Sequence, residues 1–384
     1  MASKAVQPTF PFNLQMANRL KPARVFKTAL EPVPPPPPSA QSGRSQPNTR
    51  RHITGISFDD HGDTLVTAGE DETFRLYSCK TGKHLKTLYS KKYGVDLPKF
   101  THKNSTIIYA STKEDDTIRY HSLHDNKYLR VVSLEVSPID DGFMSGSEDH
   151  TVRLWDLRTT TARGELNLPA TPIVAYDSNG VVFAVGINLY QRINLYDTKN
   201  FDKEPFLHII LDDVSLAKIS YPPRFPVMTS LSFSSNGKML LVGTAGDAHY
   251  VLDAFEGTLL YKLAGFVGLE RGKSSGPNSL GMVPSRGISG EEVCWTPDSK
   301  FVVGGSQDGR VYLWDLSEPA KLPKPAPRGV DPVVLAPSVT LDGHPGPSRC
   351  VKFNPRFIML ATAGAELAFW QPDITEKGKG PETS

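Results

Sequence analysis

Apolar and polar residues alternate in short runs along most of the chain, as at 53–58, 229–233 and 349–353. Alternation with a period of two predicts half-buried β-strands. Turn-forming sequences such as Asn-Pro, Pro-Asp-Ser and Ser-Asn-Gly separate these runs. No stretch shows the longer period of a long amphipathic helix. The pattern therefore predicts an all-β protein.

One segment repeats along the chain: it reads GSEDHTVRLWD at 146–156, GSQDGRVYLWD at 305–315 and GEDETFRLY at 69–77. Weaker copies end at 121, 197, 253 and 370. Each copy follows two predicted strands, and a fourth strand closes the unit in copies before the last one, as at 85–88 and 259–263. Four short strands with a Trp-Asp signature are typical of a propeller blade of the WD-repeat type. The seven copies therefore predict a seven-bladed WD40-type β-propeller.

The spacing of the copies predicts where the propeller is interrupted. A blade takes about 40 to 45 residues, and three longer gaps predict surface insertions. These are 212–227, the Gly/Ser-rich 265–290 and the Pro-rich 317–337. The gap between positions 121 and 155 is short instead, because the expected fourth strand at 126–130 runs directly into the next strand. We expect this junction, between Arg130 and Val131, to be costly for blades two and three.

The two ends of the chain predict how the ring closes. The last copy has no fourth strand after it, whereas 23–27 reads as a strand without a blade, so we expect this N-terminal strand to complete the last blade. The propeller then spans 19–373, with flexible segments at 1–18 and 374–384. A Pro-rich linker at 31–50 contains five consecutive prolines, Pro34 to Pro38, and such a run adopts polyproline II. A ligand for an SH3 or WW domain is the alternative to a solvated linker there.

Composition excludes several classes of protein. The three cysteines, Cys79, Cys294 and Cys350, are too few and too scattered for a disulfide scaffold, which predicts a reduced intracellular protein. A formal net charge of +2 is too small to drive sequence-independent DNA binding. No apolar run approaches the roughly 20 residues of a membrane span or forms a signal-peptide core. We therefore expect a soluble protein that is not secreted and has no direct sequence-specific contact with nucleic acid.

Motifs for catalysis or metal binding are present only in fragments. Residues 272–276 fit the letters Gly-x-Ser-x-Gly, but they lack the strand before and the helix after that a nucleophile needs. His102, His121 and His124 lack the cysteines of a zinc set, and side chains three apart on a strand point to opposite faces. We expect no catalytic residue, no cofactor and no bound metal.

The repeated polar and aromatic residues are expected to be structural. A carboxylate in the turn before the third strand accepts backbone N–H bonds and fixes the reversal, and three turns carry one at Asp71, Asp149 and Asp308. Large aromatic residues on the third strand pack between blades, and these are Trp155, Trp314 and Trp370. His344 follows Gly343 and is expected to order a turn. Lys91, Lys92 and Tyr93 instead lie in a connector, where two cations and a ring are suited to an acidic or phosphorylated peptide.

Six stretches are more specific than a WD repeat: 88–97, 115–128, 201–203, 253–255, 353–357 and 368–370. They resemble the nuclear WD-repeat subunit of COMPASS, the Set-type histone H3 lysine 4 methyltransferase complex. The resemblance runs from about Lys21 to Pro372. It implies a non-catalytic docking scaffold in the nucleus, bound to the Set-type catalytic subunit and other COMPASS subunits. It also implies binding to cleavage and polyadenylation factor subunits, a role in mRNA 3'-end processing and transcription termination, and an indirect link to RNA polymerase II.

The chain departs from this family at two kinds of position. After 128–130 the family continues into a Gly-His turn of eight or so residues that this chain lacks, while 31–50, 265–290 and 317–337 extend loops that are short in the family. The alternative function is a substrate receptor of a ubiquitin ligase, a role that many propellers have. Fold alone does not select between these functions, because binding depends on the loops.

Overall fold

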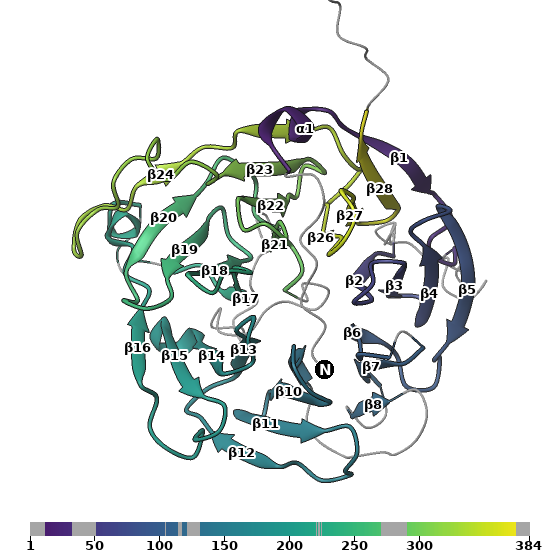
Figure 1. The fold of residues 1–384 in the computed structure, drawn as a ribbon, viewed down its shortest axis with the longest axis horizontal. Coiled ribbons are helices and arrows are strands. Elements are labelled where there is room, and N and C mark those ends of the chain that lie inside the picture. The colour runs from purple at the N-terminus through teal and green to yellow at the C-terminus, as the bar shows by residue number, and fades with distance from the viewer. Residues whose placement is uncertain are drawn as a thin grey trace, which may run out of the picture.

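The computed structural model describes residues 12–32, 51–103, 105–113, 117–120, 131–219, 221, 223, 225–269 and 290–373. Seven small sheets stand around a common centre and form a ring (Figure 1). The helix α1 (Leu14–Asn18) has only five residues, so nearly all of the regular structure is β-strand. Within the described residues no helix has the length and apolarity that a membrane span needs. The predicted all-β, seven-bladed propeller is confirmed.

Blades 1 to 3 follow one another along the chain. Blades 1 and 3 are four-stranded antiparallel sheets, and three strands of blade 2 lie within the described residues. From the centre outward, blade 1 contains β2 (Ile53–Phe58), β3 (Thr64–Gly69), β4 (Thr73–Ser78) and β5 (Lys83–Tyr89); blade 2 contains β6 (Asp96–Phe100), β7 (Ile107–Ala110) and β8 (Ile118–Tyr120); and blade 3 contains β9 (Val131–Val136), β10 (Gly142–Ser147), β11 (Thr151–Asp156) and β12 (Gly164–Asn167).

Blades 4 to 7 complete the ring, and the insertions enlarge two of their connectors. Blade 4 contains β13 (Pro172–Tyr176), β14 (Val182–Ile187), β15 (Arg192–Asp197) and β16 (Leu207–Ile210); blade 5 contains β17 (Met228–Phe233), β18 (Met239–Thr244), β19 (His249–Asp253) and β20 (Leu259–Leu263); blade 6 contains β21 (Val293–Trp295), β22 (Phe301–Gly305), β23 (Val311–Asp315) and β25 (Val339–Leu341); and blade 7 contains β26 (Cys350–Phe353), β27 (Leu360–Ala363) and β28 (Leu367–Pro372). Short 3-10 helices lie at η2 (Asn188–Tyr190) and η3 (Val214–Lys218).

The hydrophobic core lies between neighbouring blades. Trp155 of blade 3 packs with Leu97 and Ile118 of blade 2. Trp314 of blade 6 packs in the same way with Leu241 of blade 5. Each sheet therefore buries both faces against its neighbours, which explains why second strands such as β18 and β22 are apolar or glycine at nearly every position.

A strand from the N-terminal end closes the ring. β1 (Leu20–Phe26) pairs antiparallel with β28, from Leu20 opposite Pro372 to Phe26 opposite Leu367. The ring of Phe26 then lies 4.7 Å from that of Tyr77 in blade 1, and β1 and β28 run side by side at the edge of the ring (Figure 1). This confirms closure by the N-terminal strand, which begins three residues earlier than the predicted 23–27.

Residues before β1 also belong to the packed structure. Asn13 caps α1 by accepting a hydrogen bond from the Met16 N–H at 2.9 Å. Phe12 is 3% exposed, and its ring lies 5.2 Å from Phe301 and 5.1 Å from Phe353, in blades 6 and 7. The flexible segment at 1–18 stays a prediction, although within it an apolar anchor at Phe12 precedes the helix and packs between two blades.

The Pro-rich insertion at 317–337 adds a strand to its neighbour. β24 (Val334–Leu335) pairs in parallel with β20, so that blade 5 has five strands. Residues 316–333 run outside blades 5 and 6 to reach it (Figure 1). The other insertions are described at 212–219, 225–227, 265–269 and 290, and residues 272–276 with the Gly-x-Ser-x-Gly letters lie outside the described residues.

The short junction before blade 3 stays a prediction. β8 ends at Tyr120 and β9 begins at Val131, and residues 121–130 lie outside the described part of the chain. The expected strand at 126–130, Arg130 and the histidines His121 and His124 all fall in this gap. The Pro34 to Pro38 run also lies outside the described residues.

Candidate docking surface

The connector between blades 1 and 2 is a tight turn held by its neighbours. The N–H groups of Tyr93 and Gly94 donate to the carbonyl of Ser90 at 3.1 and 2.7 Å, and Gly94 has a φ of +70°. The carbonyl of Tyr93 accepts hydrogen bonds from the N–H groups of Thr112 and Lys113 in blade 2 at 2.9 and 2.8 Å. A left-handed glycine and bonds from the next blade therefore fix the position of the Tyr93 ring.

Cations surround this ring. The guanidinium carbon of Arg119, on β8, lies 3.3 Å from the centre of the Tyr93 ring, and the Lys92 ammonium lies 4.9 Å from it. Lys91 lies 5.2 Å from the ring centre of Tyr89, which is 62% exposed. Cation–π contacts of this kind hold the positive groups close to a flat aromatic surface. We call residues Tyr89, Lys91, Lys92, Tyr93 and Arg119 the basic–aromatic cluster.

Carboxylates lie beside some of these cations. Lys91, whose side chain is 61% exposed, forms an ion pair with Glu31 at 3.4 Å. Lys113 pairs with Glu72 on the adjacent turn. The basic–aromatic cluster combines cations with exposed aromatic area, which is the chemistry that binds acidic or phosphorylated segments.

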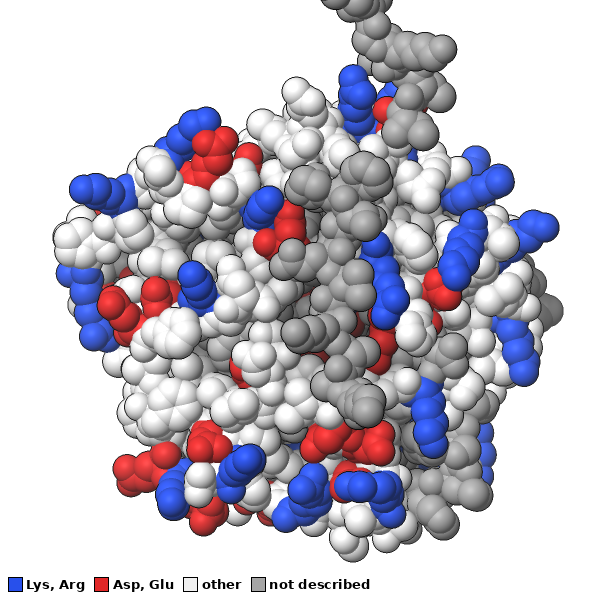
Figure 2. All heavy atoms as spheres, in the orientation of Figure 1, with Lys and Arg blue, Asp and Glu red and all other residues white. Residues whose placement is uncertain are grey.

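Further basic side chains lie on the outer strands nearby. Lys83 and Lys86 on β5 and Arg24 on β1 are exposed, and Leu85 between the two lysines is 57% exposed. In Figure 2, Lys and Arg side chains gather along the part of the rim where β1 and β5 lie in Figure 1. The edge of blade 1 is therefore positively charged as well as its connector.

The three repeated aspartates stabilise turns. Asp149 accepts hydrogen bonds from the Thr151 N–H and hydroxyl at 3.2 and 2.6 Å. Asp71 accepts from the Thr73 hydroxyl at 2.8 Å, and Asp308 accepts from the Arg310 N–H at 3.0 Å. Burial opposes ionisation of Asp149, but hydrogen bonds from Thr151 and Arg153 hold its pKa below the ordinary value. All three carboxylates thus act as acceptors within their own blades.

The indole groups and His344 also have partners within the ring. The Trp155 N–H donates to the Ser145 hydroxyl at 2.9 Å, and the Trp314 N–H donates to the Ala264 carbonyl at 3.2 Å. In blade 7 the Thr362 hydroxyl lies 2.7 Å from both the Trp370 indole nitrogen and His344 Nε2. His344 therefore links the loop before β26 to the middle of its blade.

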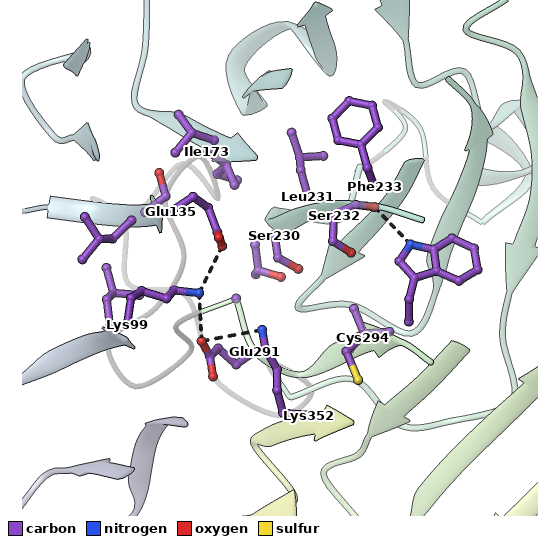
Figure 3. A pocket seen from close by; sticks show the side chains of 18 of the residues that line it. Lys99, Glu135, Ile173, Ser230, Leu231, Ser232, Phe233, Glu291, Cys294 and Lys352 are labelled. Atoms are coloured by element: carbon purple, nitrogen blue, oxygen red, sulfur yellow. Dashed lines mark hydrogen bonds and ion pairs between the residues drawn. The ribbon is translucent and has the colours of Figure 1, made fainter. Parts of the chain in front are cut away.

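A cavity of about 210 Å³ lies at the centre of the ring, and charged side chains from several blades meet in it (Figure 3). Lys99 of blade 2 forms ion pairs with Glu135 at 3.0 Å and Glu291 at 3.3 Å. Glu291 also lies 4.0 Å from Lys352 and accepts a hydrogen bond from the Ile56 N–H at 2.9 Å. Burial opposes the charged form of Lys99, but the two carboxylates outweigh it and raise its pKa. This arrangement holds Lys99 protonated and connects the inner strands of five blades.

His102 lies at a contact of three blades. Its Nδ1 is 2.8 Å from Asp60 of blade 1, and its Nε2 is 2.9 Å from the Ser137 carbonyl of blade 3. Burial lowers its pKa, but the hydrogen bond to Asp60 has the opposite effect and the net pKa is raised. Among the described residues no three His, Cys, Asp or Glu side chains form a potential metal site.

Sequence reasoning missed several of these residues. Arg119 contacts Tyr93 from a strand 26 positions later, and it appears in the sequence only as one polar residue in an alternating strand. Glu291 lies just before an inner strand and Lys99 lies within one. A charged residue at such a position was the signal that the sequence offered. Their meeting depends on closure of the ring, so local patterns do not show it.

Comparison with known proteins agrees with the repeat pattern. The family "WD domain, G-beta repeat" matches residues 44–78, 117–156 and 291–315. WD repeat-containing protein 82 of Drosophila melanogaster is 41% identical over 332 residues, which cover 84% of this chain and 92% of that protein. The Set1 complex component swd2 of Schizosaccharomyces pombe is 35% identical, with 83% of this chain and 92% of that protein covered. The COMPASS component SWD2 of Saccharomyces cerevisiae is 34% identical, with 84% and 91% covered. The chain belongs to the Swd2 family.

Membership in the Swd2 family explains the most regular parts of the molecule. The match to WD repeat-containing protein 82 covers 84% of this chain and 92% of that protein, which is far more than a single blade. The basic–aromatic cluster lies in the connector between blades 1 and 2. It is the candidate docking surface of the protein.

Proposed function

We propose that the protein is a non-catalytic docking subunit of a nuclear Set-type histone H3 lysine 4 methyltransferase complex. One observation carries this proposal: relatives named as Set1 complex and COMPASS components are 34 to 35% identical over more than four fifths of both chains. A rigid propeller is suited to the task, because its loops present fixed surfaces while its core is unaffected by binding.

We further propose that the same chain serves the cleavage and polyadenylation factor and transcription termination. Support for this part comes from the sequence stretches that resemble the family, above all 88–97 and 115–128. The first of these stretches forms the turn with Lys91, Lys92 and Tyr93, and the second contains Arg119. The most specific parts of the sequence therefore meet in the basic–aromatic cluster.

The basic–aromatic cluster is the surface proposed for an acidic or phosphorylated partner segment. Arg119 is 8% exposed beneath the Tyr93 ring, whereas Lys91 and Lys92 are exposed above the turn. Positive groups already ordered by aromatic rings and by hydrogen bonds lose little freedom on binding. An acidic ligand would displace Glu31 from Lys91.

Affinity purification of the tagged protein from nuclear extract tests the proposed function. The Set-type methyltransferase and subunits of the cleavage and polyadenylation factor should be recovered in stoichiometric amounts. The purified chain alone should show no methyltransferase, phosphatase or hydrolase activity. Recovery of a ubiquitin-ligase adaptor in place of these subunits would support the alternative function and reject this one.

Charge reversal tests the docking surface. The double variant Lys91→Glu/Lys92→Glu should fold with an unchanged melting temperature, because both side chains are exposed, but recover at least one of the two complexes in reduced amount. The matched control is Lys199→Glu/Lys238→Glu, which reverses two exposed lysines in turns of blades 4 and 5. Equal recovery with both double variants would show that the cluster is not the docking surface.

A further inference from the structure

A stretch within the Pro-rich insertion has an unusually restricted backbone. It reads Leu322-Pro323-Lys324-Pro325-Ala326-Pro327, so every residue either is proline or precedes proline. Proline fixes φ near −65°, and a residue before proline is pushed out of the helical region toward extended backbone. Residues 323–327 accordingly belong to no helix, strand or turn. Both restrictions favour polyproline II over the whole stretch. We call 322–330 the rim segment.

The rim segment is attached to the propeller at both ends. At its start, the side chain of Leu322 packs against the core between blades 5 and 6, and just before it Lys321 pairs with Glu318 at 2.6 Å. After it, Asp331 pairs with Lys218 of η3, and the Val333 carbonyl accepts a hydrogen bond from the Lys262 N–H at 2.9 Å. The β20–β24 pairing follows directly. The ends are therefore fixed and the proline-rich middle projects from the rim.

Exposure and charge indicate what the rim segment offers to a partner. Pro323, Pro325 and Pro327 are all exposed, as are Lys324 and Arg328 between and after them. The neighbouring charges, those of Lys321 and Asp331, are already in ion pairs. Within the described parts of the chain, neither Lys324 nor Arg328 contacts a carboxylate. The rim segment thus presents proline rings and two unpaired cations to solvent.

We propose that the rim segment is a docking site for a proline-recognition domain of the SH3 or WW type. Such domains bind extended proline-rich chains in a groove lined by aromatic side chains, and the ordering entropy is small because polyproline II is already populated. A carboxylate beside the groove complements Lys324 and Arg328. The partner therefore has an aromatic groove with an acidic edge. This site is separate from the basic–aromatic cluster and goes beyond the proposed function, since it holds a second partner at the outer edge of blade 5.

The test uses the purified full chain and an array of purified SH3 and WW domains. At least one domain with an acidic edge should bind with a dissociation constant below about 100 µM. The triple variant Pro323→Ala/Pro325→Ala/Pro327→Ala should weaken this binding at least tenfold. Lys324→Glu/Arg328→Glu should weaken it by a similar factor at low salt and by less at high salt, because screening reduces the charge contribution. All variants should retain the wild-type melting temperature, since the changed side chains are exposed.

The matched control replaces Pro34 to Pro38 by alanine, which removes the other proline run of this chain. This control should bind the array domain as the wild type does. The proposal is overturned if no domain binds the wild type, if the triple variant binds undiminished, or if only the Pro34 to Pro38 control loses binding. A concentration-dependent dimer that the triple variant abolishes, measured by analytical ultracentrifugation, would assign the rim segment to a second copy of the chain and also overturn it. The proposed methyltransferase-complex function is tested separately by recovery of that complex.

Discussion

Blades 3 and 5 hold their outer strands together with opposite arrangements of charge. In blade 3 the third strand carries the cation: Arg153 lies opposite Glu165 in the register and bonds to it at 2.9 Å. Asp149, in the turn before the strand, contacts the same guanidinium at 2.7 Å. All three residues belong to the repeat itself.

In blade 5 the fourth strand carries the cation. Tyr250 lies at the position of Arg153 and Lys262 at that of Glu165, and the two are opposite in the register. The carboxylate comes from outside the blade: Asp213 accepts from the Tyr250 hydroxyl at 2.9 Å and from the Lys262 ammonium at 2.7 Å. Burial raises the pKa of Asp213, but these hydrogen bonds and that from Ser215 outweigh it and the pKa is lowered. Blade 5 thus depends on an inserted connector that blade 3 does without.

Removing the inserted carboxylate should have the largest effect. Asp213 has a fully buried side chain, and Lys262 is 12% exposed, so Asp213→Ala leaves the Tyr250 hydroxyl without its acceptor and the Lys262 ammonium with only the Ser215 hydroxyl at 3.0 Å. We expect a loss of about 3 to 5 kcal/mol in the free energy of unfolding, measured by urea denaturation. Asp212→Ala is the neighbouring control and should cost far less. The double variant Asp213→Ala/Lys262→Met should recover part of the loss, because it also removes the unpaired charge.

Acid should weaken blade 5 before blade 3. His249 of β19 is buried, its Nδ1 accepts from the Thr244 N–H at 3.1 Å, and burial lowers its pKa to about 3. The unfolded chain binds a proton at this histidine below about pH 6.5, whereas the folded chain does not. The contribution of His249 to the free energy of unfolding is therefore fully present above that pH. It decreases as the pH falls toward 3, and about 2 kcal/mol is lost at pH 5.

The variant His249→Asn measures this contribution. The side-chain oxygen of the introduced asparagine replaces Nδ1 as an acceptor, but the asparagine does not titrate. The slope of unfolding free energy against pH, between pH 6.5 and 5, should decrease in this variant. A contribution of the same sign should remain from His344, whose pKa burial lowers to about 4, and one of opposite sign from His102, whose pKa is raised. An unchanged slope in His249→Asn would mean that His249 is not buried as a neutral ring.

Loss of the turn carboxylate in blade 3 should be milder. Asp149→Ala removes hydrogen bonds to Thr151 and one ion pair, but the side chain is 19% exposed and Arg153 keeps Glu165. We expect a cost of about 1 to 2 kcal/mol, again by urea denaturation. A cost equal to that of Asp213→Ala would remove the contrast between the two blades.

The smallest effect should come from the outer partner in blade 3. Glu165 is 45% exposed, and exposed ion pairs contribute about 0.2 to 1 kcal/mol. Glu165→Gln should stay within that range and lose its effect at high salt. If the variant instead matches Asp149→Ala at all salt concentrations, the exposed pair is stronger than its geometry suggests.

The contrast between blades 3 and 5 also shows which features can be predicted from sequence patterns. The turn of Asp149 and the position of Trp155 follow from the repeat, because both act within one blade or on its neighbour. Asp213 gave no such signal, since it lies in an insertion whose path depends on the finished ring. Phe12 was missed for a similar reason: a single aromatic residue before a short helix has no period, and its contacts lie in blades 6 and 7.

The candidate docking surface was only half predictable from the sequence. Two lysines and a tyrosine adjacent in sequence indicated the connector of Lys91 to Tyr93, but Arg119 completes it from another blade. The charged cavity at the centre combines residues from Lys99 to Lys352 and exists only when the blades converge. Patterns of two or four residues identify strands and turns. A site formed by several blades can be identified only when the path of the whole chain is known.

The ribosome synthesises β1 long before β28, the strand with which β1 pairs. Phe26 leaves the ribosome 341 residues before Leu367, the residue it pairs with. At about 5 to 20 residues per second, this partner appears roughly 20 to 70 s later. During that interval β1 has an unpaired edge that other strands can bind, and five of its seven residues are exposed even in the finished ring. The rate of translation therefore sets how long this edge stays without its partner strand.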